Sequence, residues 1–222
     1  MMKRYTTYLF DLDGTLTDSK AGITNSIQYA LAKMGIAATD KTRLEKFIGP
    51  PLLESFRKYY GLSDSKAREA VANYREYYAD RGIFENKIYD GISDLLSKLD
   101  ENGCRLILAT SKASLYAQKI LEHFGLDLYF DSVFGSNFDL TRASKTEIIA
   151  DIVGGIFQHS KDLCLMIGDH RDDILGAKEN GIDSVAVTYG YGSHDELIEV
   201  DPTYIVHTVD ELNALLLRFA SK

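Results

Sequence analysis

Two aspartates one residue apart, Asp11 and Asp13, stand where a short apolar run ends. The run YLF (8–10) predicts a buried strand, and Gly14 and Thr15 follow the acids. Active sites of open parallel α/β sheets collect at the carboxyl ends of strands, and two acids at such an end indicate a cationic or electrophilic partner. The alternative is an acidic turn that only closes the strand, because Asp and Gly are common turn residues.

A second group of acids follows another apolar run. Residues 163–167 predict a buried strand that Gly168 ends. A helix is predicted from about Asp172, and we expect Asp172 to cap this helix. Asp169 and Asp173 lie on either side of the turn between strand and helix. Two unit charges 4 Å apart repel by roughly 4 kcal/mol at an effective dielectric near 20, so ionised acids gathered in one site need compensation. A divalent cation supplies it, and oxygen donors favour Mg²⁺.

Two further positions are suited to contact a phosphate. Residues 105–110 predict a buried strand that ends in Thr110, whose hydroxyl can donate to a phosphoryl oxygen. Lys145 starts a helix predicted over 145–153, where the helix dipole disfavours a cation unless an anion lies between them. Lys112 is the rival for this role, and a solvated lysine is the alternative for either one.

The remaining chain divides by its hydrophobic period. Residues 19–82 show helical spacing only, with predicted helices over about 19–34, 42–47, 52–60 and 65–80. After residue 82, helices alternate with short apolar runs at 105–110, 132–134, 163–167, 184–188 and 204–207, which predicts a parallel sheet in an α/β fold. The segment 189–197 is expected to be a loop, either at the site entrance or a plain surface turn.

The stretch FDLDGTLTD (10–18) resembles the first motif of the haloacid dehalogenase superfamily. Thr110, Lys145 and GDHRDDILGA (168–177) match its three later motifs in order, so the resemblance spans essentially the whole chain. Its pattern is most similar to the phosphoglycolate-phosphatase-like and 5′-nucleotidase-like branch. The resemblance implies a Rossmann-like parallel α/β core over residues 1–17 and 84–222 and a small all-helical cap over 18–83.

The resemblance also implies roles for individual residues. The first aspartate of the family is a nucleophile that becomes a phosphoaspartate and the second is the general acid and base, which gives these roles to Asp11 and Asp13. Thr110 and Lys145 would bind and neutralise the phosphoryl oxygens. The implied Mg²⁺ contacts are a side-chain oxygen of Asp11, the backbone carbonyl of Asp13 and the carboxylate of Asp169, with Asp173 in support.

Substrate contacts are expected from less distinctive residues. Gly49 and Pro50 fix a stiff turn in the loop FIGPPLLESF (47–56), which either touches substrate or merely connects helices, and Ser111 and His170 are further candidates. The tyrosines between residues 59 and 78 either stack on substrate or, as we expect, pack between helices with wet hydroxyls.

The predicted activity is a magnesium-dependent phosphatase for a phosphoglycolate- or nucleoside-monophosphate-type phosphomonoester. A β-phosphoglucomutase-like phosphomutase would use the same motifs, and a phospho-accepting receiver module is the alternative from another class.

Composition excludes few classes of function. Among the 222 residues, 25 are basic and 33 acidic, and the net charge of −8 argues weakly against nucleic-acid or anionic-membrane partners. No apolar run approaches the roughly 20 residues of a membrane span or forms a signal peptide. Cys104 and Cys164 form no CxxC pair and are expected as reduced core residues, so we expect a cytoplasmic protein of unknown oligomeric state.

Overall fold

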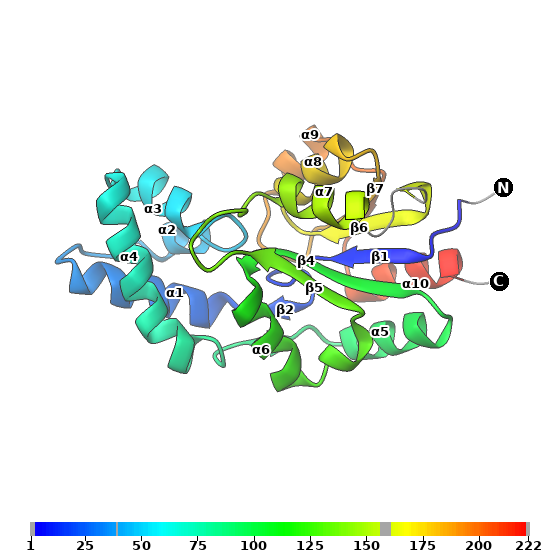
Figure 1. Ribbon diagram of the computed structural model, residues 1–222, viewed down its shortest axis with the longest axis horizontal. Coiled ribbons are helices and arrows are strands. Elements are labelled where there is room, and N and C mark those ends of the chain that lie inside the picture. The colour runs from blue at the N-terminus through cyan, green and yellow to red at the C-terminus, as the bar shows by residue number, and fades with distance from the viewer. Residues whose placement is uncertain (1–2, 39, 156–160, 221–222) are drawn as a thin grey trace.

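The computed structural model describes residues 3–38, 40–155 and 161–220 (Figure 1). Six strands form one sheet in the order β5-β4-β1-β6-β7-β8, and every neighbouring pair is parallel. The strands are β1 (Thr7–Phe10), β4 (Arg105–Ala113), β5 (Ser132–Ser136), β6 (Cys164–Gly168), β7 (Asp183–Val187) and β8 (Tyr204–Val206). The predicted parallel α/β fold is confirmed.

The first strand lies in the middle of this sheet. All four residues of β1 are buried, and Phe10 pairs with Leu108 of β4 on one side and with Ile167 of β6 on the other. Strands covered on both faces are continuously apolar, as β1 is. The chain runs outward through β4 and β5 and then crosses to β6, so the strand order reverses at β1 and creates the crevice in which such sheets bind ligands.

Helices cover both faces of the sheet (Figure 1). On one face lie α5 (Ile92–Glu101), α6 (Ser114–Phe124) and α10 (Val209–Ala220), and on the other α7 (Lys145–Gly155), α8 (Arg171–Glu179) and α9 (His194–Glu199). The short α9 lies in the segment predicted to be a loop. It buries only Leu197, so it leaves almost no periodic signal in the sequence.

Four helices and a π-helical turn lie beyond the carboxyl end of β1 (Figure 1). They are α1 (Lys20–Lys33), α2 (Lys41–Glu45), α3 (Leu52–Tyr60), α4 (Asp64–Tyr77) and η1 (Tyr78–Gly82), and we call residues 20–82 the helical insert. Gly22 and Gly82 bring α1 against η1, because a Cβ on Gly22 would lie 1.9 Å from the Gly82 carbonyl oxygen. Phe47 packs edge-on against Phe56 inside the insert.

A two-stranded ribbon joins the helical insert to the sheet. It pairs β2 (Thr17–Asp18) antiparallel with β3 (Lys87–Ile88), so both chain connections of the insert lie side by side. The division into a core over 1–17 and 84–222 and a separate helical domain over 18–83 stays a prediction. Within the described ranges, neither Cys104 nor Cys164 forms a disulfide. None of the helices in the described ranges has the length and apolarity needed to cross a bilayer.

Candidate active site

A buried lysine lies beside the first aspartate. Asp11 follows β1 and its N–H donates to the Ile167 carbonyl oxygen at 2.9 Å. The Nζ of Lys145, the first residue of α7, lies 2.8 Å from Asp11 Oδ1, from Asp173 Oδ1 and from the Ala109 carbonyl oxygen. Burial by itself would lower the pKa of Lys145, but the two carboxylates outweigh it and raise that pKa above its usual value. Lys145 is therefore a buried cation.

Three carboxylates gather at this end of the sheet. Asp11, Asp169 and Asp173 are all buried, and one oxygen of each lies within 4.8 Å of the others. Burial, together with the charges of Asp11 and Asp173, raises the pKa of Asp169 to about 7. Burial also raises the pKa of Asp173 to about 6, although Lys145 opposes this shift. These groups favour an additional cation, and their oxygen atoms fit the ligand preference of Mg²⁺.

The turn before α8 differs from its prediction. The helix begins at Arg171, and its N-cap is His170 rather than Asp172, so the predicted capping role of Asp172 is wrong. His170 Nδ1 accepts from the Asp172 N–H at 3.3 Å, while Asp173 Oδ2 accepts from the His170 N–H at 3.0 Å. This reciprocal capping box fixes Asp173 in the first turn of the helix, which could not be read from the order of acids alone.

The second aspartate has a lysine of its own. Lys112 Nζ lies 2.8 Å from Asp13 Oδ2 and donates to the Tyr78 hydroxyl at 2.7 Å. The two lysines that the sequence left as rivals thus contact different aspartates. Strand β4 continues past Thr110 to Ala113 with a shift of register, which carries Lys112 to the carboxyl edge. Thr110 is buried, and its Oγ1 accepts from the Lys112 N–H at 3.3 Å.

A cavity of about 80 Å³ lies between the helical insert and the sheet. Ser111, Gly49 and Pro50, three of the four expected substrate contacts, line it together with Asp13 and Lys112. Most of the remaining lining is apolar or aromatic, and the aromatic side chains are Phe47, Tyr74, Tyr78 and Tyr116. The expectation of wet hydroxyls fails for Tyr78, because its hydroxyl accepts from Lys112.

His170 lies apart from that lining, beneath the turn of the insert. A Cβ on Gly49 would lie 3.5 Å from His170 Cδ2, so the imidazole and this glycine are near neighbours. Burial opposes protonation of the ring, but the Asp172 carboxylate, whose Oδ2 lies 3.4 Å from Nδ1, raises the pKa of His170. His170 is not among the three residues of the carboxylate group.

The loop 189–192 holds a role that the sequence did not reveal. The Tyr191 N–H donates to Asp169 Oδ2 at 2.7 Å, and the Tyr191 hydroxyl bonds Asp18 and accepts from the Lys20 N–H. A Cβ on Gly190 would lie 2.4 Å from Asp169 Cβ, so the loop is pressed against this acid. In the sequence, the feature that could have indicated this role is the pair Gly190 and Gly192 on either side of Tyr191, just after a predicted strand.

Another contact to Asp169 was also missed. Thr15 Oγ1 donates to Asp169 Oδ1 at 3.3 Å, which links the turn after β1 to the turn after β6. Gly14 lies at the same place with φ +85°, and a Cβ there would fall 2.2 Å from Asp169 Oδ2. The two turns therefore fit together only because residue 14 is a glycine.

Comparison with known proteins gives a consistent result. A family model described as haloacid dehalogenase-like hydrolase matches residues 8–187. A 5′-nucleotidase of Pseudomonas aeruginosa is 45% identical over 216 residues, 96% of this chain and 96% of that protein. Tyrosine-protein kinase PtkA of Mycobacterium tuberculosis is 40% identical over 210 residues, 94% of this chain and 71% of that protein.

A solved structure agrees with the sequence matches. The crystal structure of a predicted phosphatase from Clostridium acetobutylicum superposes with a TM-score of 0.93 at 45% identity, covering 97% of this chain and 99% of that one. The resemblance found in the sequence motifs is confirmed over most of the chain. The chain therefore belongs to the haloacid dehalogenase-like hydrolase family.

Proposed function

We propose that this hydrolase is a magnesium-dependent phosphatase that acts on a small phosphorylated metabolite through a phosphoaspartate at Asp11. The observation that carries the proposal is the buried group of Asp11, Asp169 and Asp173 around Lys145, at the carboxyl edge of the sheet and beside the cavity. The name of the 5′-nucleotidase relative supports a phosphomonoester. Neither the phosphomutase nor the receiver module is favoured by the matches.

Mg²⁺ would be held by Asp11, Asp169 and the backbone carbonyl of Asp13, with Asp173 beside them. When bound, the ion supplies positive charge that offsets the repulsion between the carboxylates and the incoming phosphate. Lys145 adds a fixed positive charge next to Asp11, the proposed nucleophile. Asp173 keeps Lys145 in place, because its carboxylate contacts the same ammonium group.

The reaction has two steps. A carboxylate oxygen of Asp11 attacks phosphorus, the bond from phosphorus to the substrate oxygen breaks, and Asp13 gives that oxygen its proton. Water then attacks phosphorus, Asp13 accepts a proton from the water, and the bond between Asp11 and phosphorus breaks to release inorganic phosphate. In both steps the Thr110 hydroxyl would donate to a phosphoryl oxygen.

The substrate enters between sheet and helical insert, which we propose acts as a cap. The aromatic and apolar lining suits the organic part of a small phosphomonoester, of the phosphoglycolate or nucleoside-monophosphate type. The net charge of −8 fits such a substrate better than a nucleic-acid polymer. Thiols at Cys104 and Cys164 that form no disulfide in the described part of the chain fit a reducing compartment such as the cytoplasm.

The first test replaces the nucleophile. Asp11→Asn removes the charged oxygen that attacks phosphorus, so we expect hydrolysis of p-nitrophenyl phosphate with Mg²⁺ to fall to background while the circular dichroism spectrum stays the same. Asp195→Asn is the matched control, because that side chain is fully exposed and should leave the rate unchanged. Retained activity of Asp11→Asn would exclude the nucleophile assignment.

The substrate class is tested with wild-type protein. Phosphate release from phosphoglycolate and from nucleoside monophosphates, measured in parallel with Mg²⁺, identifies which type has the higher kcat/KM. Isomerisation of a sugar phosphate without phosphate release would instead support the phosphomutase.

A further inference from the structure

The two oxygens of the Asp13 carboxylate have different surroundings. Oδ2 lies 2.8 Å from Lys112 Nζ, whereas Oδ1 is buried and has no hydrogen-bond partner among the residues that the structure describes. Asp13 and Lys112 both line the cavity under the helical insert. One oxygen of the proposed acid is thus anchored, and the other is left for a group that enters the cavity.

Lys112 is a buried cation held from two sides. Its side chain is only 7% exposed, and its Nζ forms an ion pair with the Asp13 carboxylate at 2.8 Å. Its Nζ also donates to the Tyr78 hydroxyl at 2.7 Å. A side chain with four rotatable bonds loses much conformational freedom when fixed in this way, so the contacts with Asp13 and Tyr78 must both contribute to its position.

Tyr78 belongs to the helical insert and is itself held rigidly. It is the first residue of η1, its ring stacks on Tyr74 at 5.0 Å with an interplanar angle of 18°, and it meets the edge of Tyr116 at 5.3 Å. Single π-helical turns occur frequently at functional sites. A chain of contacts therefore runs from the insert through Tyr78 and Lys112 to Asp13 in the sheet.

We propose that Lys112 is a positioning residue that aims the carboxyl group of Asp13 at the leaving oxygen, and that Tyr78 holds Lys112 in place when the insert is docked. This inference rests on the proposed phosphatase function. Lys145 cannot take the same part, because its three contacts go to Asp11, Asp173 and the Ala109 carbonyl oxygen. Lys145 thus contacts Asp11, whereas Lys112 contacts Asp13.

The test compares two substrates with the same ring and different leaving groups. Phenolate needs a proton to depart, whereas p-nitrophenolate departs readily as an anion, so loss of a well-placed acid harms phenyl phosphate more. We expect Lys112→Met to lower kcat/KM for phenyl phosphate by about 100-fold, the low end of general acid catalysis, and for p-nitrophenyl phosphate by less than about 10-fold. Because kcat/KM reports the step that breaks the substrate bond, the ratio of the two values isolates this effect.

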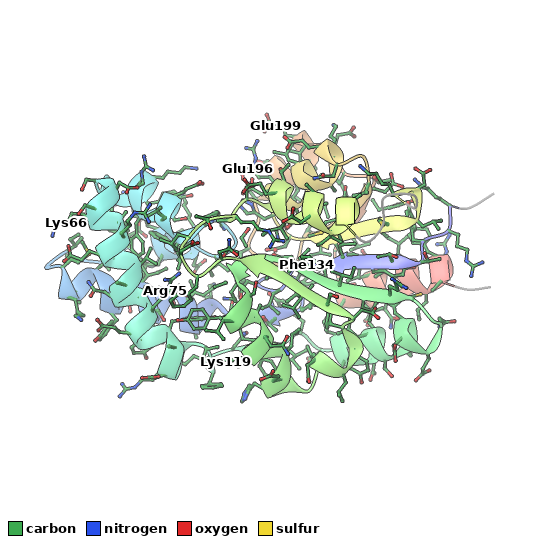
Figure 2. All side chains as sticks on the ribbon, in the orientation of Figure 1. Lys66, Arg75, Lys119, Phe134, Glu196 and Glu199 are labelled. Carbon is green, nitrogen blue, oxygen red and sulfur yellow. The ribbon has the colours of Figure 1, made fainter. Side chains whose placement is uncertain are left out.

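Three further variants make the result decisive. Tyr78→Phe should shift the same ratio in the same direction by a smaller factor, and it decides the question alone if Lys112→Met does not fold. The double variant should lose no more than Lys112→Met, because both changes act through one contact. Lys119→Met is the control, since Lys119 is exposed on α6 (Figure 2) and should leave the ratio unchanged.

An unchanged ratio in Lys112→Met and Tyr78→Phe, or an equal loss on both substrates, would overturn the inference. The phosphatase proposal would survive that outcome, provided that Asp11→Asn is inactive. Retained activity of Asp11→Asn, in contrast, would reject the phosphatase mechanism itself and with it the role of Lys112.

Discussion

Asp169 and Asp173 carry pKa values of about 7 and about 6, well above those of exposed aspartates, because burial and neighbouring carboxylates disfavour their charged forms. A raised pKa of an acid has a definite consequence for stability. The unfolded chain ionises these groups above about pH 4, whereas the folded chain resists ionisation until about pH 6 to 7. The contribution of these two groups to the free energy of unfolding of the metal-free protein therefore falls as pH rises through this window.

This leads to a prediction for Mg²⁺. A bound cation favours the ionised carboxylates, so we expect Mg²⁺ to raise the thermal unfolding midpoint by more at pH 7.5 than at pH 5. Each unit of pKa shift corresponds to about 1.4 kcal/mol, so the difference should amount to several degrees. Asp169→Asn is the control and should remove most of the dependence on pH. Equal midpoint shifts at both pH values would contradict the metal assignment.

The residues of the candidate site can be proposed from sequence, but their contacts cannot. Asp11, Asp13 and Asp169 stand directly after apolar runs, so their place at the edge of the sheet follows from the strand pattern. The choice between Lys112 and Lys145 depends on the register shift at the end of β4 and on where the insert docks. Both features come from tertiary packing, which local spacing does not encode.

At the scale of elements, the loop 189–192 joins Asp169 to the first connection of the insert. Its backbone holds the acid, and its two tyrosine hydroxyls contact the segment between β1 and α1, with Tyr189 donating to the Thr15 carbonyl oxygen at 2.9 Å. The glycines allow this close approach, since a Cβ on Gly190 would also meet the Gly14 carbonyl oxygen at 2.4 Å. The loop therefore helps to fix the position of the Asp169 carboxylate.

Gly190→Ala tests this support. The new methyl group would push the loop away from Asp169 and misorient this acid, so we expect the Mg²⁺ concentration for half-maximal activity to rise by about 10-fold or more, as for other residues that orient metal ligands. Gly154→Ala is the matched control, because a Cβ on this exposed helical glycine would meet no described atom within 4 Å. If Gly190→Ala binds Mg²⁺ as the wild type does, measured by titration calorimetry, the loop does not orient the acid.

The six strands of the main sheet, down to the three-residue β8, and the longer helices followed from the sequence, whereas the two-residue strands did not. The stripe of Ile92, Leu95, Leu96 and Leu99 predicts α5, and all four side chains are buried. In contrast, β2 and β3 have two residues each, and their pairing joins segments about 70 residues apart, so no local pattern marks them. The sequence likewise predicts one helix over 65–80, whereas α4 ends at Tyr77 and the π-helical turn η1 follows it.

At the scale of the whole molecule, polar contacts of α4 and η1 tie the helical insert to segments of the α/β part of the chain. Besides the contact of Tyr78 with Lys112, Arg75 of α4 donates to the Phe138 carbonyl oxygen at 2.7 Å and lies 3.9 Å above the Phe138 ring. Figure 2 shows Arg75 on the side of α4 that faces the sheet. Phe138 belongs to the segment between β5 and α7, and Arg75 itself lines the cavity, so this pair ties α4 to that segment.

Arg75→Ala should weaken the docked arrangement of the insert. We expect KM for p-nitrophenyl phosphate to rise by roughly 3- to 10-fold, the effect of losing a contact worth about 1 kcal/mol, with little change in the thermal midpoint. Arg68→Ala removes another arginine of α4, whose ion pair with Asp64 is exposed, and serves as control. Equal KM values in Arg75→Ala and the wild type would show that this pair does not hold the insert.

The ribbon of β2 and β3 affects how the sequence of this enzyme can evolve. The chain leaves the sheet at Thr17 and Asp18 and returns at Lys87 and Ile88, which are their direct partners. Lengthening, trimming or swapping the intervening stretch leaves the ends of β1 and β4 where they are. Substrate preference can thus diverge through this single stretch while Asp11, Asp169, Asp173 and Lys145, which all lie outside it, are inherited unchanged.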